Sequence, residues 1–115
     1  MTTQMRLRKD SNSNVTYGIA FSNTGSYTTL AASTEQTLTV PQEVTDALFQ
    51  YSVGTNVFVD VGSTPLSLPG GIFTSTTADL NPIIRQVTPG ETLRFISDTP
   101  AYVKVSFYNT DRPSY

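Results

Sequence analysis

The amino-acid sequence predicts an all-β protein, folded as a single antiparallel β-sandwich or small barrel of jelly-roll-like form. Three observations lead to this prediction. Apolar residues alternate with polar ones in several short segments, turn-forming residues separate these segments, and no segment has the periodicity of an amphipathic helix. The composition agrees, because the chain of 115 residues contains 19 Thr and 12 Ser, and β-branched threonine favours strands.

The N-terminal third is predicted to form three strands. The first covers 15–21, where the residues that alternate with small or polar neighbours, and are expected to share a buried face, are Val15, Tyr17, Ile19 and Phe21. A turn at 23–26 leads to a Thr-rich strand over 27–32. A third strand covers 35–40 and ends at Pro41, because proline cannot donate a hydrogen bond to a sheet.

The middle of the chain is predicted to form a β-hairpin over 47–61, after a short helical turn at 41–46. The connection Gly54-Thr55-Asn56 is compact and has the composition of a hairpin loop. The residues expected to face the core are Ala47, Phe49, Tyr51 and Val53 on the first strand and Val57, Val59 and Val61 on the second. Alternation on both sides of a tight turn makes this the clearest element in the sequence.

Residues 62–82 are rich in Gly, Pro, Ser and Thr, without a clear period. Connections of this length are uncommon inside a compact domain and are usually functional or mobile. Two short strands are predicted within the segment, near Leu66 and at 72–73.

The C-terminal part is predicted to be a strand over 83–87 followed by a closing hairpin over 87–108. Pro89-Gly90 suits the centre of a type II turn, because proline fixes φ and glycine supplies a positive φ. In the last strand the residues expected to face the core are Val103, Val105 and Phe107, and those expected to face solvent include Tyr102 and Tyr108.

We therefore divide the chain into a polar N-terminal arm (1–14), a β-sandwich domain (15–108) and a C-terminal tail (109–115). The arm carries a basic cluster of Arg6, Arg8 and Lys9, and no apolar run of a signal peptide follows it. No run of about 18 apolar residues occurs, so no membrane span is expected.

The composition excludes most catalytic chemistry. Without His or Cys, the chain cannot build a Ser-His-Asp triad, a thiol nucleophile or the common zinc sites. The remaining candidates for a carboxylate pair are Asp60, Asp79, Glu91 and Asp98, and such a pair requires a defined separation across a cleft. We expect these residues to be structural, and we expect no catalytic residue, metal or cofactor.

The partner-binding residues are expected among basic and aromatic side chains. The formal net charge is −2, which gives no reason to expect specific nucleic-acid binding. Tyrosine surrounded by Ser and Thr suits contact with protein or sugar. The predicted partner-binding residues are Arg6, Arg8, Lys9, Tyr102, Tyr108, Arg112 and Tyr115.

The order of segments over 33–108 resembles that of small β-sandwich virion proteins of tailed bacteriophages and some other viruses, including head decoration and minor capsid proteins. The segments that carry the resemblance are TLTVP, LFQYSVGTNVFVDVG, the Gly-rich stretch after them, TPGETLRFI and the final Val-x-Val-x-Phe-Tyr strand. The resemblance implies a non-enzymatic protein that binds other virion proteins in many copies, as a homo-oligomer, with trimers at local three-fold positions as one arrangement.

The expected function is that of a capsid decoration (cement) protein, which binds the major capsid protein and stabilises the assembled head. Its location would be the virion, assembled in the host cytoplasm. The expected contact elements are the basic arm, the segment 62–82 and the tail. Three alternatives remain open: a low-copy vertex, neck or tail protein, a carbohydrate-binding module that stacks sugars on Tyr102 and Tyr108, and an enzyme with two carboxylates.

Overall fold

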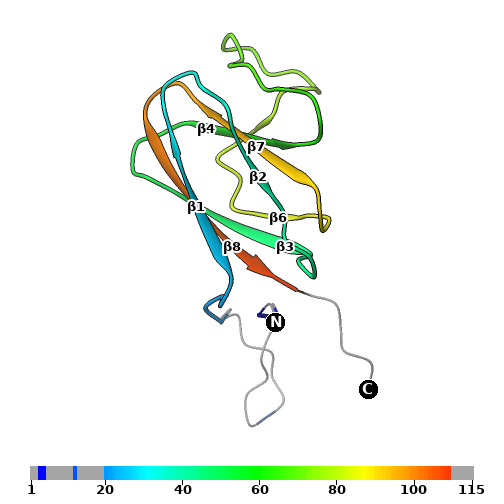
Figure 1. Ribbon diagram of the computed structural model, residues 1–115. Helices are drawn as coiled ribbons and strands as arrows, with labels where there is room; N and C mark the ends of the chain where they lie inside the picture. Colours follow the sequence, from blue (N-terminus) through cyan, green and yellow to red (C-terminus); the bar gives the residue numbers. More distant parts are fainter. Residues whose placement is uncertain (1–2, 5–11, 13–19, 110–115) are drawn as a thin grey trace.

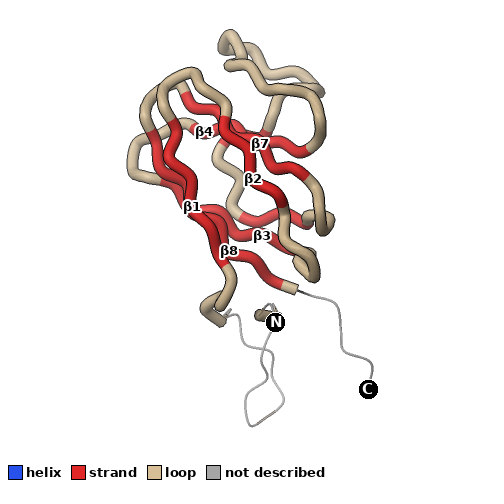
Figure 2. The backbone as a smooth tube through the Cα atoms, viewed as in Figure 1, coloured by secondary structure: helices blue, strands red, loops and turns tan. Residues whose placement is uncertain are grey.

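A computed structural model describes residues 3–4, 12 and 20–109 of the chain. Its strands are β1 (Gly25–Leu30), β2 (Gln36–Thr39), β3 (Asp46–Tyr51), β4 (Val57–Val61), β5 (Asp79–Leu80), β6 (Ile84–Gln86), β7 (Thr92–Ser97) and β8 (Ala101–Tyr108). The described residues contain strands, turns and loops but no helix (Figures 1 and 2). The prediction of an all-β protein is therefore confirmed.

The strands form two four-stranded sheets. Sheet I has the order β1-β8-β3-β6, and sheet II has the order β2-β7-β4-β5. Every pairing within the two sheets is antiparallel. The predicted antiparallel β-sandwich is thus present, with the two sheets packed face to face.

The pairings are nested about the middle of the chain. The first strand pairs with the last (β1 with β8), and the same rule gives β2 with β7, β3 with β6 and β4 with β5. The chain is therefore one long hairpin, rolled so that β3 also pairs with β8 and β4 with β7. This is the arrangement of a jelly roll. The innermost connection, residues 62–78, projects beyond the strands in green at the top of Figure 1.

The hydrophobic core lies between the inner faces of the two sheets. Phe107 of sheet I and Phe95 of sheet II are almost completely buried. The Phe49 ring of sheet I meets the Phe95 ring edge-on, with 6.3 Å between centroids, so this pair ties the sheets together. The buried aliphatic residues around these rings are Leu30, Val40, Val44, Val57, Val59, Leu93, Val103 and Val105.

Both predicted hairpins are wrong. The compact connection at 52–56 joins β3 of sheet I to β4 of sheet II, and the turn at 98–100 joins β7 of sheet II to β8 of sheet I. In each case the chain crosses between the sheets and does not return beside itself. Local turn composition does not distinguish the two outcomes, because a short loop can span the sandwich as well as close a hairpin.

Several local predictions are corrected in the same region. Residues 41–45 form a connection with a turn at 42–43 and no helix, and β3 already begins at Asp46. No strand occurs near Leu66 or at 72–73, whereas β5 forms later. Two valines expected in the core are exposed, Val53 completely and Val61 to 44%. Both lie beyond the buried part of their strands: Val53 is in the loop after β3, and Val61 is the last residue of β4.

The turn at 88–91 is confirmed. The Glu91 N–H donates to the Thr88 carbonyl at 3.1 Å, and Gly90 has a φ of 84°. That φ lies in the left-handed region, which glycine adopts without steric cost. The turn delivers the chain from β6 in sheet I to β7 in sheet II.

Most of the first predicted strand, 15–21, cannot be placed in the structure. Residues 15–19 lie outside the described part of the chain. Ala20 and Phe21 are described and are not in a strand, and the Phe21 side chain is fully exposed. The predicted turn at 23–26 is also shorter than expected, because β1 already begins at Gly25.

Asn81 fastens the crossing from β5 to β6. Its side-chain oxygen accepts the Val57 N–H at 2.8 Å, its amide donates to the Thr55 carbonyl at 3.1 Å, and its own N–H donates to the Val57 carbonyl at 2.8 Å. Its φ of 47° is left-handed, which asparagine tolerates better than most residues. One side chain therefore joins the connection after β5 to the loop before β4.

We predict that Asn81→Ala lowers the free energy of unfolding by about 1–3 kcal/mol, because it leaves polar backbone groups of Val57 and Thr55 without partners. Asn81→Gly keeps the positive φ and removes the same hydrogen bonds. Urea titration of both variants separates the two contributions. Equal stability of wild type and Asn81→Ala would show that the side chain does not fasten this crossing.

Candidate binding surfaces

The outer face of sheet I contains a groove of about 620 Å³ that crosses the strands. One side is a cross-strand row, in which Tyr27 of β1 lies opposite Lys104 of β8 and Lys104 lies opposite Gln50 of β3. The next row, with Ser106 opposite Leu48, lines the groove beside it. We call this feature the outer groove.

The other side of the outer groove is the segment 20–24. The Tyr108 hydroxyl donates to the Ala20 carbonyl at 2.7 Å, and the Ser22 hydroxyl contacts the Phe107 carbonyl at 2.5 Å. These bonds hold the segment against the end of β8. The wall is therefore fixed to the sheet and carries the exposed ring of Phe21 along the groove.

The long connection 62–78, which we call the tip loop, is fixed at its start by a largely buried ion pair. The Arg94 guanidinium lies 2.8 Å from a Glu35 carboxylate oxygen, with side chains 15% and 19% exposed. Arg94 also donates to the Gly62 carbonyl at 2.6 Å, and the Leu66 N–H donates to the other Glu35 oxygen. The pair thus ties the loop to β7 and to the residue before β2.

The far part of the tip loop is uncharged and exposes two large apolar side chains. The Phe73 ring meets the Phe58 ring edge-on, with 6.2 Å between the ring centroids. Phe58 lies on the outer face of sheet II and is only 8% exposed. Ile72 and Phe73 themselves are 79% and 61% exposed. No residue of 62–78 carries a charge. The loop therefore presents an apolar surface on a defined support.

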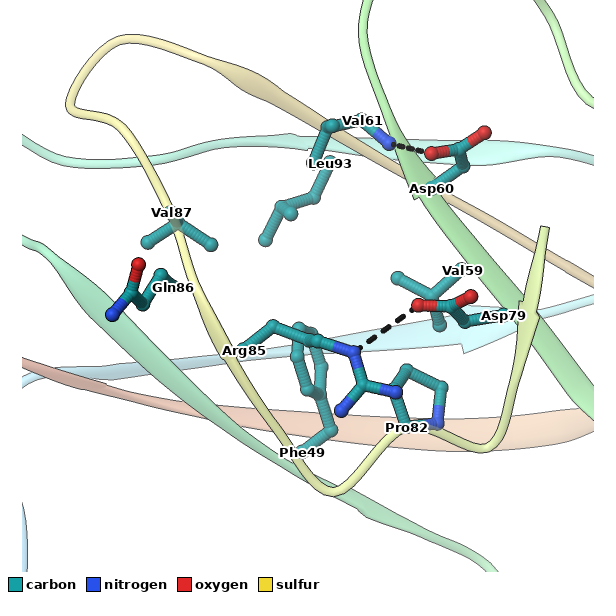
Figure 3. Close-up of a pocket in the computed structure, with 10 residues that line it drawn as sticks. All are labelled: Phe49, Val59, Asp60, Val61, Asp79, Pro82, Arg85, Gln86, Val87 and Leu93. Atoms are coloured by element: carbon teal, nitrogen blue, oxygen red, sulfur yellow. Dashed lines mark hydrogen bonds and ion pairs between the residues drawn. The ribbon is translucent and has the colours of Figure 1, made fainter. Parts of the chain in front are cut away.

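A smaller pocket of about 130 Å³ lies between the sheets at the edge formed by β5 and β6 (Figure 3). Its deep part is apolar, with Phe49, Val59 and Leu93, and its rim carries Asp60, Asp79 and Arg85. Two of the candidate carboxylates therefore meet at one opening, although nothing in their sequence spacing indicates this.

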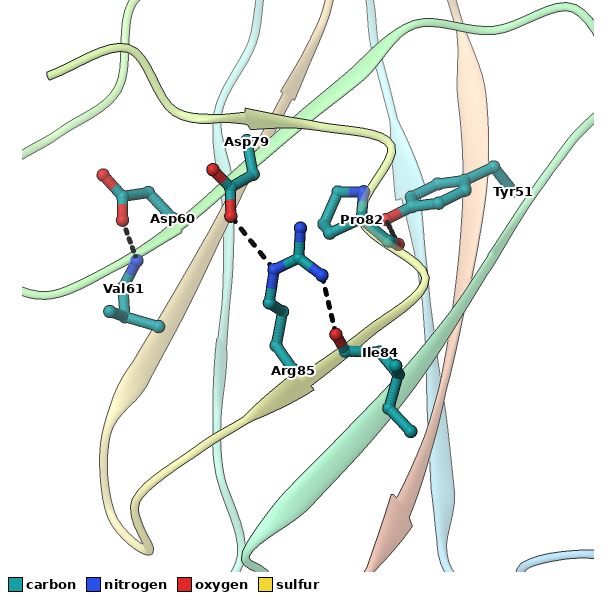
Figure 4. Close-up of polar contacts among 7 residues, drawn as sticks. All are labelled: Tyr51, Asp60, Val61, Asp79, Pro82, Ile84 and Arg85. Carbon is teal, nitrogen blue, oxygen red and sulfur yellow. Dashed lines mark hydrogen bonds and ion pairs between the residues drawn. The ribbon is translucent and has the colours of Figure 1, made fainter. Parts of the chain in front are cut away.

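Both rim carboxylates have partners. Figure 4 shows Asp79 facing Arg85, with 3.1 Å between carboxylate oxygen and guanidinium nitrogen, whereas Asp60 accepts the Val61 N–H at 2.8 Å. Arg85 also donates to the Ile84 carbonyl. The other two candidate carboxylates lie elsewhere: Glu91 accepts the Thr88 N–H, and Asp98 is exposed in the 98–100 turn.

Tyr51 lies next to Pro82, which lines this pocket. Its hydroxyl donates to the Pro82 carbonyl at 2.5 Å (Figure 4). Burial raises the pKa of the Tyr51 hydroxyl, because the charged form would lose its solvation. Tyr51 therefore acts as a neutral hydrogen-bond donor that joins β3 to the turn before β6.

The structure separates the predicted partner-binding residues into three groups. Tyr102 is 64% exposed on the outer face of sheet I, as predicted. The prediction that Tyr108 lies on the surface is wrong. Its side chain is 3% exposed, and its hydroxyl donates a hydrogen bond to the Ala20 carbonyl beneath the 20–24 wall. The remaining predicted residues lie outside the described part of the chain: Arg6, Arg8, Lys9, Arg112 and Tyr115.

Sequence reasoning missed Tyr27, Gln50 and Lys104 as surface groups that lie together. Alternation placed Gln50 and Lys104 on the outward faces of their strands and gave no face for Tyr27, and the proximity of the three depends on the pairing of β1 and β3 with β8. Two residues of the predicted arm, Thr3 and Gln4, also have defined contacts. Thr3 exchanges hydrogen bonds with Asn23, and Gln4 forms a parallel bridge with Asn109.

Comparison of the chain with protein-family models, with curated proteins and with solved structures finds no match in any of the three. Among the described residues, no helix is long and apolar enough to cross a membrane. Within the same residues, no three acidic side chains gather as a group that could hold a metal ion.

We predict measurable coupling between Glu35 and Arg94. In a double-mutant cycle with Glu35→Ala and Arg94→Ala, the coupling free energy should be about 0.5–3 kcal/mol, because the two side chains are largely shielded from solvent. Amide exchange at Leu66 should accelerate in Glu35→Ala, which removes its acceptor. Additive effects together with unchanged exchange would mean that the pair does not hold the tip loop.

Proposed function

We propose that this protein is a non-enzymatic structural component of a virion, which decorates the assembled head and binds the major capsid protein. The jelly-roll order of its strands supports the proposal, because that fold recurs in viral capsid proteins. The same fold also occurs in lectins and cupins, so the fold does not decide between functions. Only features of the surface can distinguish these functions.

The tip loop is the observation that carries the proposal. An exposed apolar patch on a fixed support is typical of a site that becomes buried against another protein. Ile72 and Phe73 are such a patch, and the Glu35–Arg94 pair and the Phe58–Phe73 contact define the support. An uncharged loop also makes a contact that salt screens only weakly.

Decoration would stabilise the head by mass action, because a protein that binds only the assembled shell shifts the equilibrium toward that shell. Several weak contacts engaged together would give strong attachment. In addition to the tip loop, the basic arm with Arg6, Arg8 and Lys9 and the tail with Arg112 and Tyr115 remain predicted contacts. The head surface is favoured over a vertex, neck or tail position only by the resemblance of the sequence.

The first test is the copy ratio of this chain to the major capsid protein in purified particles, measured by quantitative peptide mass spectrometry. Decoration predicts a ratio within a few-fold of unity, because each local symmetry position would hold a copy. A copy ratio far below unity would instead indicate a low-copy vertex, neck or tail protein. Absence from particles would refute the virion proposal altogether.

The second test addresses the tip loop directly. Ile72→Ser should weaken rebinding to particles stripped of the protein by about tenfold, because it removes roughly 1.5 kcal/mol or more of apolar burial. Val53→Ser is the matched control, since Val53 is also a β-branched aliphatic residue, is fully exposed and lies in a different loop. Equal binding of both variants and wild type would exclude the tip loop as the contact.

A further inference from the structure

We propose that the outer groove of sheet I is a carbohydrate-binding site, with Tyr27 as its principal stacking residue. This inference does not rest on the virion proposal. The sequence indicated Tyr102 and Tyr108 as sugar-stacking residues, and the burial of Tyr108 removes that pair. The groove assembles a different set from β1, β3, β8 and the 20–24 wall.

Exposed aromatic rings flank the groove. Tyr27 lines it from the sheet and is 78% exposed, and Phe21 lines it from the wall and is fully exposed. Tyr102 continues the aromatic surface beyond the groove, because it lies opposite Thr29, two residues along β1 from Tyr27. A ring that stays in solvent beside a hollow offers its face to the C–H face of a sugar, which is flat and weakly apolar.

Polar side chains that make no hydrogen bond within the described part of the chain lie next to these rings. Gln50, Lys104 and Ser106 line the groove, and none of them makes a side-chain hydrogen bond within the described part of the chain. Together they provide amide, ammonium and hydroxyl groups that match sugar hydroxyls as donors and acceptors. Adjacent strands are about 4.8 Å apart, so the Tyr27–Lys104–Gln50 row spaces these groups at roughly the length of one pyranose ring.

The composition of the groove favours a sugar over a protein segment as its occupant. A protein interface usually buries a continuous apolar centre, whereas Ala20 and Leu48 are the aliphatic residues here and the aromatic rings are interspersed with amide, ammonium and hydroxyl side chains. Among the described residues, no carboxylate lines the groove and Lys104 is its single charged group. The site therefore accepts neutral oligosaccharides, and Lys104 can pair with the carboxylate of an acidic one.

The experiment uses the full chain with isotopic labelling and three defined probes: a chito-oligosaccharide, a cello-oligosaccharide and sialyllactose. Titration should shift the backbone amides of Tyr27, Lys104 and Gln50 in a saturable manner. Tyr27→Ala should weaken binding roughly tenfold, the equivalent of about 1.4 kcal/mol. Tyr102→Ala should weaken it less, because Tyr102 lies beyond the groove.

Ile83→Ala is the matched control, because Ile83 is a large exposed side chain on a different connection. It should leave binding unchanged. Lys104→Gln should selectively weaken an acidic probe and remove the salt dependence of its binding. A neutral probe should bind that variant as it binds wild type.

Three results would overturn the proposal. The first is the absence of binding both to these probes and on an array of neutral and acidic glycans. The second is binding that persists unchanged in Tyr27→Ala. The third is concentration-dependent self-association that Tyr27→Ala abolishes, which would make the groove an interface between copies. Particle attachment in Tyr27→Ala should remain normal, so failure here and failure of the virion proposal are distinguishable.

Discussion

The nested pairing of the strands is the constraint on which the rest of the structure depends. Because β1 pairs with β8 and β2 with β7, the strands β7 and β8 lie at the centres of their sheets, each between two of the strands β1 to β4. The core residues, the outer groove and the edge pocket all follow from that placement. The Phe49–Phe95 contact is one consequence, since it joins residues far apart in sequence across the two sheets.

Alternation in the sequence was a reliable guide to which residues face inward on the later strands, and a poor guide to which strands are neighbours. Val103, Val105 and Phe107 are buried as predicted. The two hairpins were wrong because a period of two residues reports only on the faces of a strand. The choice between a hairpin and a crossing is made by the whole sandwich, which has two inner faces to fill.

The candidate surfaces were less predictable, for a related reason. Tyr102 could be located from its position alone, but Tyr108 has the same outward position and is buried, because the segment 20–24 passes over it. Phe58 is also outward by alternation and is covered by Phe73 of the tip loop. The sequence did contain a signal that Phe58 would be covered. Phe58 is an apolar residue at an outward position, and the long loop that follows contains apolar residues that could cover it. Its partner could be identified only in three dimensions.

The late position of the central strands also bears on how the protein is made. A ribosome adds residues from one end at about 5–20 per second, and neither sheet is continuous until β7 and then β8 have been added. Until that moment β1 and β2 have no strand beside them, and their open edges are available to other chains. The sandwich can therefore close only after β8 has been synthesised, and a chain that stops before β8 would leave both β1 and β3 unpaired along that edge.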